Sequence, residues 1–123
     1  MMSGIVNTDL EPLLKLTVRD AGGQLHDCEA VIDSGFNGFL TLPPVLIAAL
    51  GLAWLCRQQG QLADGSILAF DVYVATVDWH GQQRSVEVEA TDAQPLLGMA
   101  IMQGSELRIQ VVPGGTVAIA ENP

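Results

Sequence analysis

Apolar and polar residues alternate along several short segments in the first third of the chain, as expected for strands with one buried face. In Leu14 to Val18, apolar residues occupy every second position and lysine or threonine the positions between them. Asp20 to Gly23 predicts a turn, and a second strand is expected over Leu25 to Ile32. After a glycine-bearing bend at Ser34 to Gly38, Phe39 to Leu42 predicts a third strand.

A short helix is expected directly after this third strand. Pro43 and Pro44 cannot continue a central strand, but proline is tolerated in the first turn of a helix. Val45 to Leu50 contains good helix formers, and Gly51 stands where a C-terminal cap belongs. Because its surroundings in the sequence are apolar, we expect this helix to be packed into the body of the protein.

Two hairpins are predicted in the middle of the chain. Gln61 to Val77 forms the first, with Asp64-Gly65 as a two-residue turn in which glycine supplies a positive φ. The second turns at His80-Gly81, between strands over Asp71 to Trp79 and Gln83 to Ala90. Arg84, Glu87 and Glu89 interrupt the apolar character of this last strand, which indicates a solvated edge with surface acids.

The C-terminal third predicts a further series of short elements. Pro95 to Gly98 is expected to be a compact apolar turn, followed by one helical turn over Met99 to Gln103. Strands are expected over Leu107 to Val111 and Thr116 to Ala120, with a turn at Pro113 to Gly115. No linker interrupts the pattern, so residues 1–123 predict one mostly-β (all-β) domain with one or two short helices.

Composition indicates a folded chain and makes some partners improbable. Of the 123 residues, 49% are apolar and only 15% charged, unlike a disordered chain. Fourteen acidic and five basic residues give a formal charge of −9, which repels phosphate backbones and anionic lipid. We therefore expect neither a nucleic-acid nor a membrane partner.

Cysteine and histidine usage predicts no metal site and no cofactor. Cys28 and Cys56 lie far apart, and both are expected to be buried structural thiols. His26 and Cys28 are two residues apart, but no second cluster of ligands accompanies them. The N-terminus lacks the basic start and apolar stretch of a signal peptide, and no apolar run is long enough to span a bilayer. These features predict a cytoplasmic protein with reduced thiols.

The segment Val31-Ile32-Asp33-Ser34-Gly35 carries the clearest chemical information. An aspartate at the end of an apolar strand is costly to bury unless it is paired or hydrogen-bonded. Ser34 supplies a hydroxyl, and Gly35 allows a backbone N–H to approach the carboxylate closely. Taken alone, Asp-Ser-Gly is also a common turn sequence.

The order of motifs around this triplet changes its significance. Phe36 to Pro43 returns at once to a strand, a glycine-bearing hairpin tip follows at Ala63 to Ser66, and Leu96 to Gly98 precedes a short helix. This order resembles the retroviral-type (retropepsin-like) aspartic proteases, and especially their small bacterial single-domain relatives. The resemblance extends from about Gly4 to Ala120, with Asp-Ser-Gly in place of the commoner Asp-Thr-Gly.

This resemblance implies a barrel-half fold closed as a homodimer. Because the chain holds one triplet where pepsin-like enzymes hold two, the second aspartate is expected from a second copy about a two-fold axis. The two Asp33 carboxylates then share one proton, and the pair activates a water for hydrolysis of an extended peptide. The hairpin over Leu62 to Tyr73 is the implied flap, and the Leu-Leu-Gly motif packs beside the catalytic loop.

The implied site therefore has three parts: catalytic Asp33, Ser34 and Gly35; flap residues Ala63, Asp64, Gly65 and Ser66; and supporting residues Leu97 and Gly98. Two alternatives remain open, since a fold does not guarantee its activity. The second hypothesis is a catalytically silent module of the same fold that binds peptide or protein without cutting it, and a third, weaker one is a dimerisation module serving a neighbouring protein.

Overall fold

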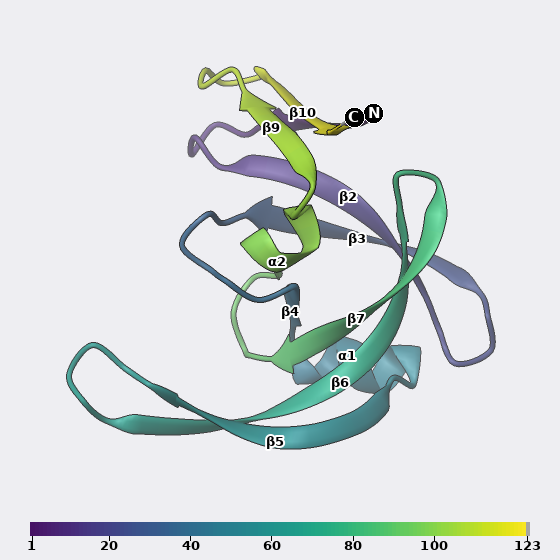
Figure 1. Cartoon of the computed structure of the whole chain (residues 1–123), viewed down its shortest axis with the longest axis vertical. Helices are drawn as coiled ribbons and strands as arrows, with labels where there is room; N and C mark the ends of the chain where they lie inside the picture. The colour runs from purple at the N-terminus through teal and green to yellow at the C-terminus, as the bar shows by residue number, and fades with distance from the viewer. Residues whose placement is uncertain (123) are drawn as a thin grey trace.

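Ten strands form one sheet, accompanied by two short helices, in residues 1–122, the part of the chain described by the computed structural model (Figure 1). The predicted mostly-β class is confirmed. In chain order the elements are β1 (Met2–Val6), β2 (Pro12–Arg19), β3 (Leu25–Ile32), β4 (Leu40–Leu42), α1 (Pro44–Leu50), β5 (Ala53–Gln61), β6 (Ile67–Trp79), β7 (Gln82–Ala90), β8 (Leu96–Leu97), α2 (Met99–Met102), β9 (Ser105–Ile109) and β10 (Thr116–Glu121).

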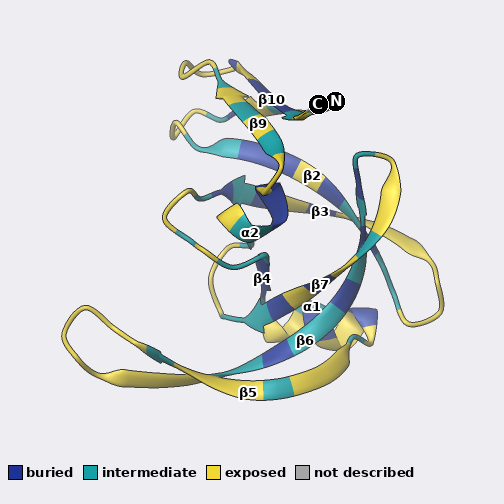
Figure 2. Cartoon of the chain, in the orientation of Figure 1, coloured by how far each residue is buried: buried dark blue, intermediate teal, exposed yellow. Residues whose placement is uncertain are grey.

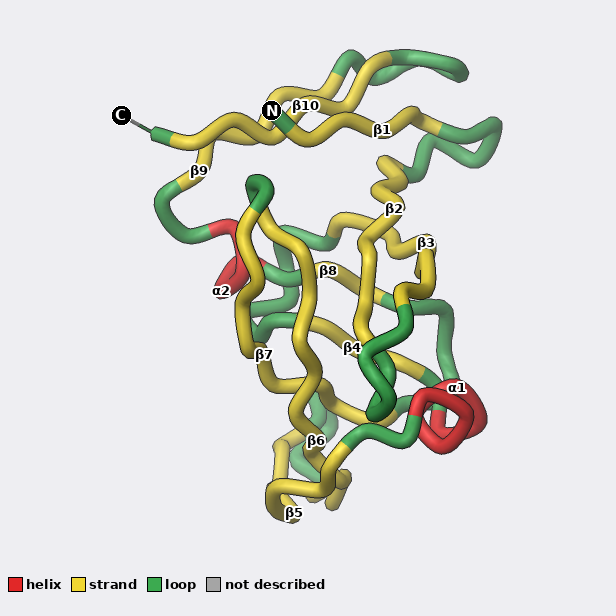
Figure 3. Tube along the Cα trace, turned by 90° about the vertical axis from the view of Figure 1, so that its right-hand side faces the viewer, coloured by secondary structure: helices red, strands yellow, loops and turns green. Residues whose placement is uncertain are grey.

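The sheet curls until two of its non-adjacent strands meet. Its strand order is β5-β6-β7-β4-β8-β3-β2-β1-β10-β9, and β6 also pairs with β2 through Val18 and Val77. The strands from β6 to β2 in this order therefore form a closed ring. Their inward side chains make the core, in which Leu16, Val88 and Leu97 are fully buried. The strands β1, β10 and β9 lie together at one end of the molecule (Figure 3).

Elements with strong local signals lie where the pattern predicts them. β2 and β3 cover the two expected strands, and the His80-Gly81 turn joins β6 to β7 with both residues at positive φ. Helix α1 follows Pro43, and Gly51 ends it in the left-handed conformation at φ 66°. The helix is less buried than expected, because Ile47 and Leu50 enter the core whereas Val45 is 83% exposed.

Three predictions about strands are wrong, and each error concerns which strands pair. Residues 95–98 form no simple turn, because β8 hydrogen-bonds to two strands. Strand β7 is no solvated edge, since it lies between β6 and β4. The first hairpin starts at Ala53 rather than Gln61, because β5, which the pattern does not mark, pairs with β6. The sequence pattern also does not predict strand β1, and β9 begins and ends two residues earlier than expected.

The β5–β6 hairpin is a long arm that extends away from the closed ring (Figure 1). Its outer part is exposed on both faces (Figure 2), and Trp54, Ile67 and Leu68 are each more than half exposed. Its tip is a wider turn than the predicted two-residue one. Leu62 N donates to Ser66 O at 2.8 Å and Gly65 N to Leu62 O at 2.9 Å, with Gly65 at φ 87°.

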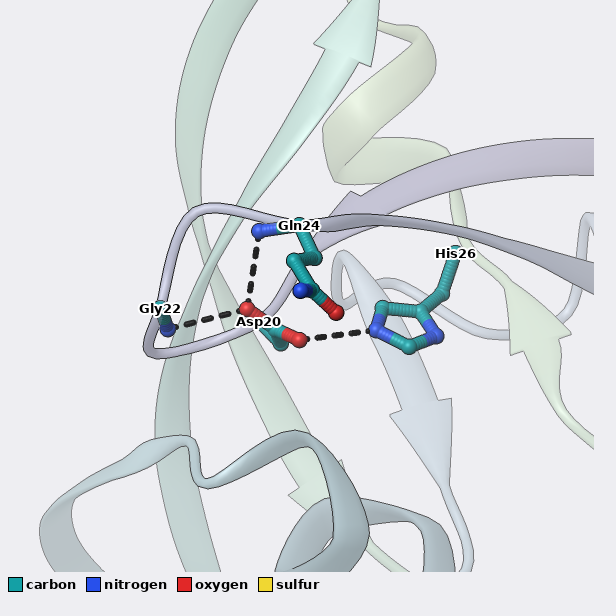
Figure 4. Close-up of polar contacts among 4 residues, drawn as sticks. All are labelled: Asp20, Gly22, Gln24 and His26. Carbon is teal, nitrogen blue, oxygen red and sulfur yellow. Dashed lines mark hydrogen bonds and ion pairs between the residues drawn. The ribbon is translucent and has the colours of Figure 1, made fainter.

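The turn between β2 and β3 is organised by one carboxylate (Figure 4). Oδ1 of Asp20 accepts hydrogen bonds from the backbone N–H groups of Gly22 and Gln24, both at 2.9 Å. Oδ2 lies 2.9 Å from Nε2 of His26. The hydrogen bond to His26, followed by the bond from Gln24, lowers the pKa of Asp20 below its ordinary value. Ala21 N also donates to Leu50 O at 2.9 Å, so this turn is attached to the end of α1.

We expect Asp20→Asn to lower the free energy of unfolding at neutral pH. Because the pKa of Asp20 is lowered in the folded state, the stability it contributes is present above its unfolded pKa and is lost as pH falls through the folded value. Urea denaturation at pH 7 and near pH 3 measures this: the deficit of the variant should shrink at the acidic pH. Glu29→Gln, an exposed change on the same hairpin, is the control, and an equal deficit at both pH values would contradict the assignment.

Candidate functional site

Asp33 follows the last residue of β3 and is held in a tight turn by three hydrogen bonds. Its backbone N–H donates to Leu97 O at 2.9 Å, and its carbonyl accepts from Phe36 N at 3.2 Å. Carboxylate Oδ1 accepts from Gly35 N at 2.8 Å. The residue is half-buried, so its carboxylate is fixed in direction while remaining accessible.

The path of the loop after Asp33 is determined by β8. This strand lies between β3, to which it pairs in parallel through Val31 and Ile32, and β4, to which it pairs antiparallel through Leu40. The chain leaving β3 must therefore pass the end of β8 before it can enter β4. Residues 33–39 make this crossing, and Asp33 stands at its first position.

A glycine at the end of β8 makes this close crossing possible. A Cβ atom on Gly98 would lie 2.1 Å from Gly38 O and 2.7 Å from the Phe36 ring, distances that no side chain could occupy. The two segments are joined by backbone hydrogen bonds from Gly98 N to Phe39 O (2.9 Å), Met99 N to Phe36 O (2.8 Å) and Ala100 N to Gly38 O (3.0 Å). The loop that carries Asp33 is thus bound along its length to β8 and the start of α2.

Thr41 provides a side-chain bond that holds β8 in this position. Its side chain is buried, with 4% of the residue exposed, and Oγ1 accepts from Leu96 N at 2.9 Å. Leu96 precedes Leu97, whose carbonyl accepts from Asp33. Thr41 therefore stabilises the Asp33 turn indirectly, by holding β8 in position. A hydroxyl in the middle of an apolar strand is the signal that could have singled it out.

The structure brings two of the three parts of the implied site together. The loop that begins with Asp33, Ser34 and Gly35 is bonded to Leu97 through Asp33 and to Gly98 through Phe39. The flap residues Ala63, Asp64, Gly65 and Ser66, in contrast, form the exposed tip of the arm. In the view of Figure 1, the β3–β4 loop and this tip lie on the same side of the molecule.

The polar side chains of the Asp33 loop and of the arm tip differ in their hydrogen bonding. The Ser34 side chain is exposed and forms no hydrogen bond within residues 1–122. At the tip of the arm, Asp64 Oδ1 accepts from Ser66 Oγ at 2.6 Å and from Ser66 N at 2.9 Å. These two bonds lower the pKa of Asp64. The tip is therefore internally ordered, although it is exposed.

A pocket of about 400 Å³ lies between the Asp33 loop and the base of the arm. It is lined by Phe36, Asn37, Gly38, Phe39, Gln58, Val72, Glu87 and Glu89. None of these was a sequence-based candidate, and Glu87 and Glu89 were expected to be surface acids. Their spacing of two places both on one face of β7, but only the parallel pairing of β7 with β4 turns that face toward the loop.

Glu89 is the more enclosed of the two acids. A Cβ atom on Gly38 would lie 2.6 Å from its Oε2, which shows how closely the carboxylate approaches the loop. Burial first, and then the charge of Glu87, raise the pKa of Glu89 above its ordinary value. No ion pair within residues 1–122 neutralises either carboxylate.

Neither cysteine forms part of this site. Cys28 is buried as expected, and burial, followed by the nearby charge of Asp27, raises the pKa of its thiol. Cys56 is only half-buried on the arm, so the prediction for this residue is wrong. Within residues 1–122 no group of three or more histidine, cysteine or acidic side chains is arranged to hold a metal ion. Neither helix in this part of the chain is long and apolar enough to cross a membrane.

Comparisons of the chain with protein-family models, with curated protein sequences and with solved structures gave no match.

We expect Thr41→Val to destabilise the protein by about 1–3 kcal/mol, since the isosteric change leaves the partly buried Leu96 N–H without its side-chain partner. Thr41→Ser keeps the hydroxyl and should retain the bond. Urea denaturation gives the stability, and hydrogen exchange at the Leu96 and Asp33 amides reports whether the loop loosens. Equal protection of these amides in both variants would contradict the proposed path of support.

We expect Glu89→Gln to raise the free energy of unfolding at neutral pH. A carboxyl whose pKa is raised in the folded state opposes folding once pH exceeds its unfolded value, and this cost is absent at acidic pH. Thermal denaturation should therefore show a higher Tm at pH 7 and no difference near pH 3. Glu29→Gln removes an exposed acid opposite Lys15 and should give no increase. A lower Tm for Glu89→Gln at pH 7 would contradict this account.

Proposed function

We propose that the chain is a retropepsin-like aspartic endopeptidase that works as a homodimer, with one Asp33 from each subunit. The observation that supports this most directly is the position of Asp33. It is accessible, stands first in a loop bound to β8 and α2, and is oriented by the Gly35 N–H. A fixed, accessible carboxylate at the end of a half-buried strand suits a reacting group better than a purely structural turn.

One carboxylate cannot act as acid and base in the same step. In the proposed dimer, the two Asp33 carboxyl groups meet at the two-fold axis and hold one proton between them, because two like charges at about 3 Å are unfavourable. The exposed Ser34 side chains would then lie close to the partner subunit, where a hydroxyl can bond.

The reaction follows from this shared proton. The ionised Asp33 accepts a proton from water as the water oxygen forms a bond to the peptide carbonyl carbon. The protonated Asp33 of the other subunit donates its proton to the carbonyl oxygen, which gives a neutral tetrahedral diol. As this diol collapses, one of its hydroxyl protons passes to the ionised Asp33, and the protonated Asp33 gives its proton to the leaving nitrogen. The C–N bond breaks, a carboxylic acid and an amine are released, and the pair of carboxyl groups again holds one proton.

The β5–β6 arm is the proposed flap. Its backbone offers the strand geometry that an extended peptide can pair with, and its exposed apolar side chains are suited to covering a bound chain. Closure of the arm over the substrate would exclude bulk water from the two carboxyl groups.

We expect Asp33→Asn to abolish peptide cleavage while leaving the fold and the dimer intact, because the amide can neither hold the shared proton nor accept one from water. A peptide library assayed between acidic and neutral pH, with and without a pepstatin-like inhibitor, measures the activity. Asp9→Asn, an exposed change outside the loop, should cleave as the parent does. Sedimentation and circular dichroism establish the dimer and the fold.

Two results would overturn the proposal. If the purified dimer cleaves no member of the library and Asp33→Asn changes nothing, the chain is a peptide-binding or dimerisation module without catalysis. If a crystal structure of the dimer places the Asp33 carboxyl groups more than about 6 Å apart, they cannot share a proton in that state.

A further inference from the structure

The pocket beside the Asp33 loop has walls of two chemical kinds. Phe36, Phe39 and Val72 supply apolar surface, and Glu87 and Glu89 supply carboxylates. Phe36 is the residue directly after the Asp33-Ser34-Gly35 triplet, so the pocket begins where the proposed reacting residues end. Its volume of about 400 Å³ lies within the range of about 300–1,000 Å³ that is usual for ligand pockets.

The charge of this pocket is entirely negative. Both ionisable residues that line it are glutamates, and neither forms an ion pair within residues 1–122. Arg84 is a basic residue close to the pocket wall, but it forms no ion pair with Glu87 or Glu89. Its guanidinium lies 5.6 Å from the Phe39 ring centre, and Nη1 donates to Ile101 O at 2.9 Å.

An occupant that fits this pocket has an apolar stem and a positive end. Lysine and arginine side chains pack their methylene groups against apolar surface while the charged group reaches a polar partner. Their cations also bind favourably near an aromatic face such as that of Phe36. An acidic side chain would meet two carboxylates, and a neutral one would leave their mutual repulsion unrelieved.

We infer that this pocket is a specificity subsite for a lysine or arginine side chain of a peptide substrate, with Glu87 and Glu89 binding the cation. This inference rests on the proposed endopeptidase function and names its substrate class. The cation relieves the repulsion between two carboxylates that the fold holds on one face of β7. Selectivity for a basic side chain is therefore a property of these two residues.

Matched peptides test the subsite. Three series of otherwise identical peptides carry lysine, norleucine or glutamate at each position in turn, and kcat/KM is measured for each. At the position that enters the pocket, lysine should exceed its neutral isostere norleucine. Glu87→Gln and Glu89→Gln should each lower this lysine-to-norleucine ratio about fivefold, the effect of losing a partly exposed charge pair. The ratio should also fall as salt is added.

A charge reversal and a distant control sharpen the result. Glu87→Lys, at an exposed position, should improve cleavage of the glutamate peptide relative to the lysine peptide. Glu29→Gln removes one negative charge outside the pocket, so it should leave the lysine-to-norleucine ratio unchanged. An equal loss of selectivity in Glu29→Gln would show that the overall charge of −9, and not the pocket, attracts basic peptides.

Binding to the Asp33→Asn variant separates this inference from the proposed catalysis. Calorimetry with the lysine and norleucine peptides gives the affinity ratio in the absence of turnover. Cleavage without lysine preference overturns the subsite and leaves the endopeptidase standing. Lysine-selective binding that depends on Glu87 and Glu89, with no cleavage by the parent, supports the subsite and overturns the enzyme. Absence of both cleavage and selective binding overturns the two together.

Discussion

The insertion of β8 between β3 and β4 is the constraint on which the site depends. This strand has only two residues, Leu96 and Leu97, and lies between β3 and β4, which follow one another in the chain. Residues 33–39 connect β3 to β4 and must therefore cross the end of β8. The crossing is close enough that Gly98 cannot carry a side chain. Because Asp33 N donates to Leu97 O, the direction of the Asp33 carboxylate is coupled to the core itself.

The parts of the molecule around this crossing differ in how firmly they are held. The floor of the site, which consists of β8 and the loop of residues 33–39, is fixed by buried groups, among them Thr41, whose hydroxyl accepts a hydrogen bond from the backbone of β8. The β5–β6 arm, in contrast, is exposed on both faces in its outer half. A rigid floor and an exposed arm suit a site that must hold a reacting group in place and still admit a chain. Between them lie Glu87 and Glu89, two like charges that a basic side chain would satisfy.

Much of the fold could be predicted because its signals are local. The alternating pattern of Leu14 to Val18 marks β2, and Pro43 with Gly51 marks both ends of α1. Two of the errors share one cause, which is pairing between segments distant in the chain. In the sequence, Leu96-Leu97 resembles a turn, but in the structure these residues form a strand between β3 and β4. Glu87 and Glu89 are typical of a solvated edge strand, but their strand, β7, pairs with β4.

By itself, the sequence determined the mostly-β class, the position of Asp33 at the end of a half-buried strand, and the glycine at each tight turn. These follow from hydrophobic period and backbone sterics, which act within a few residues. The tertiary structure alone decided that Leu97 supports Asp33, that Thr41 supports β8, and that Glu87 and Glu89 face the Asp33 loop. Each of these contacts is made only when strand order is fixed, and strand order is a property of the whole closed sheet.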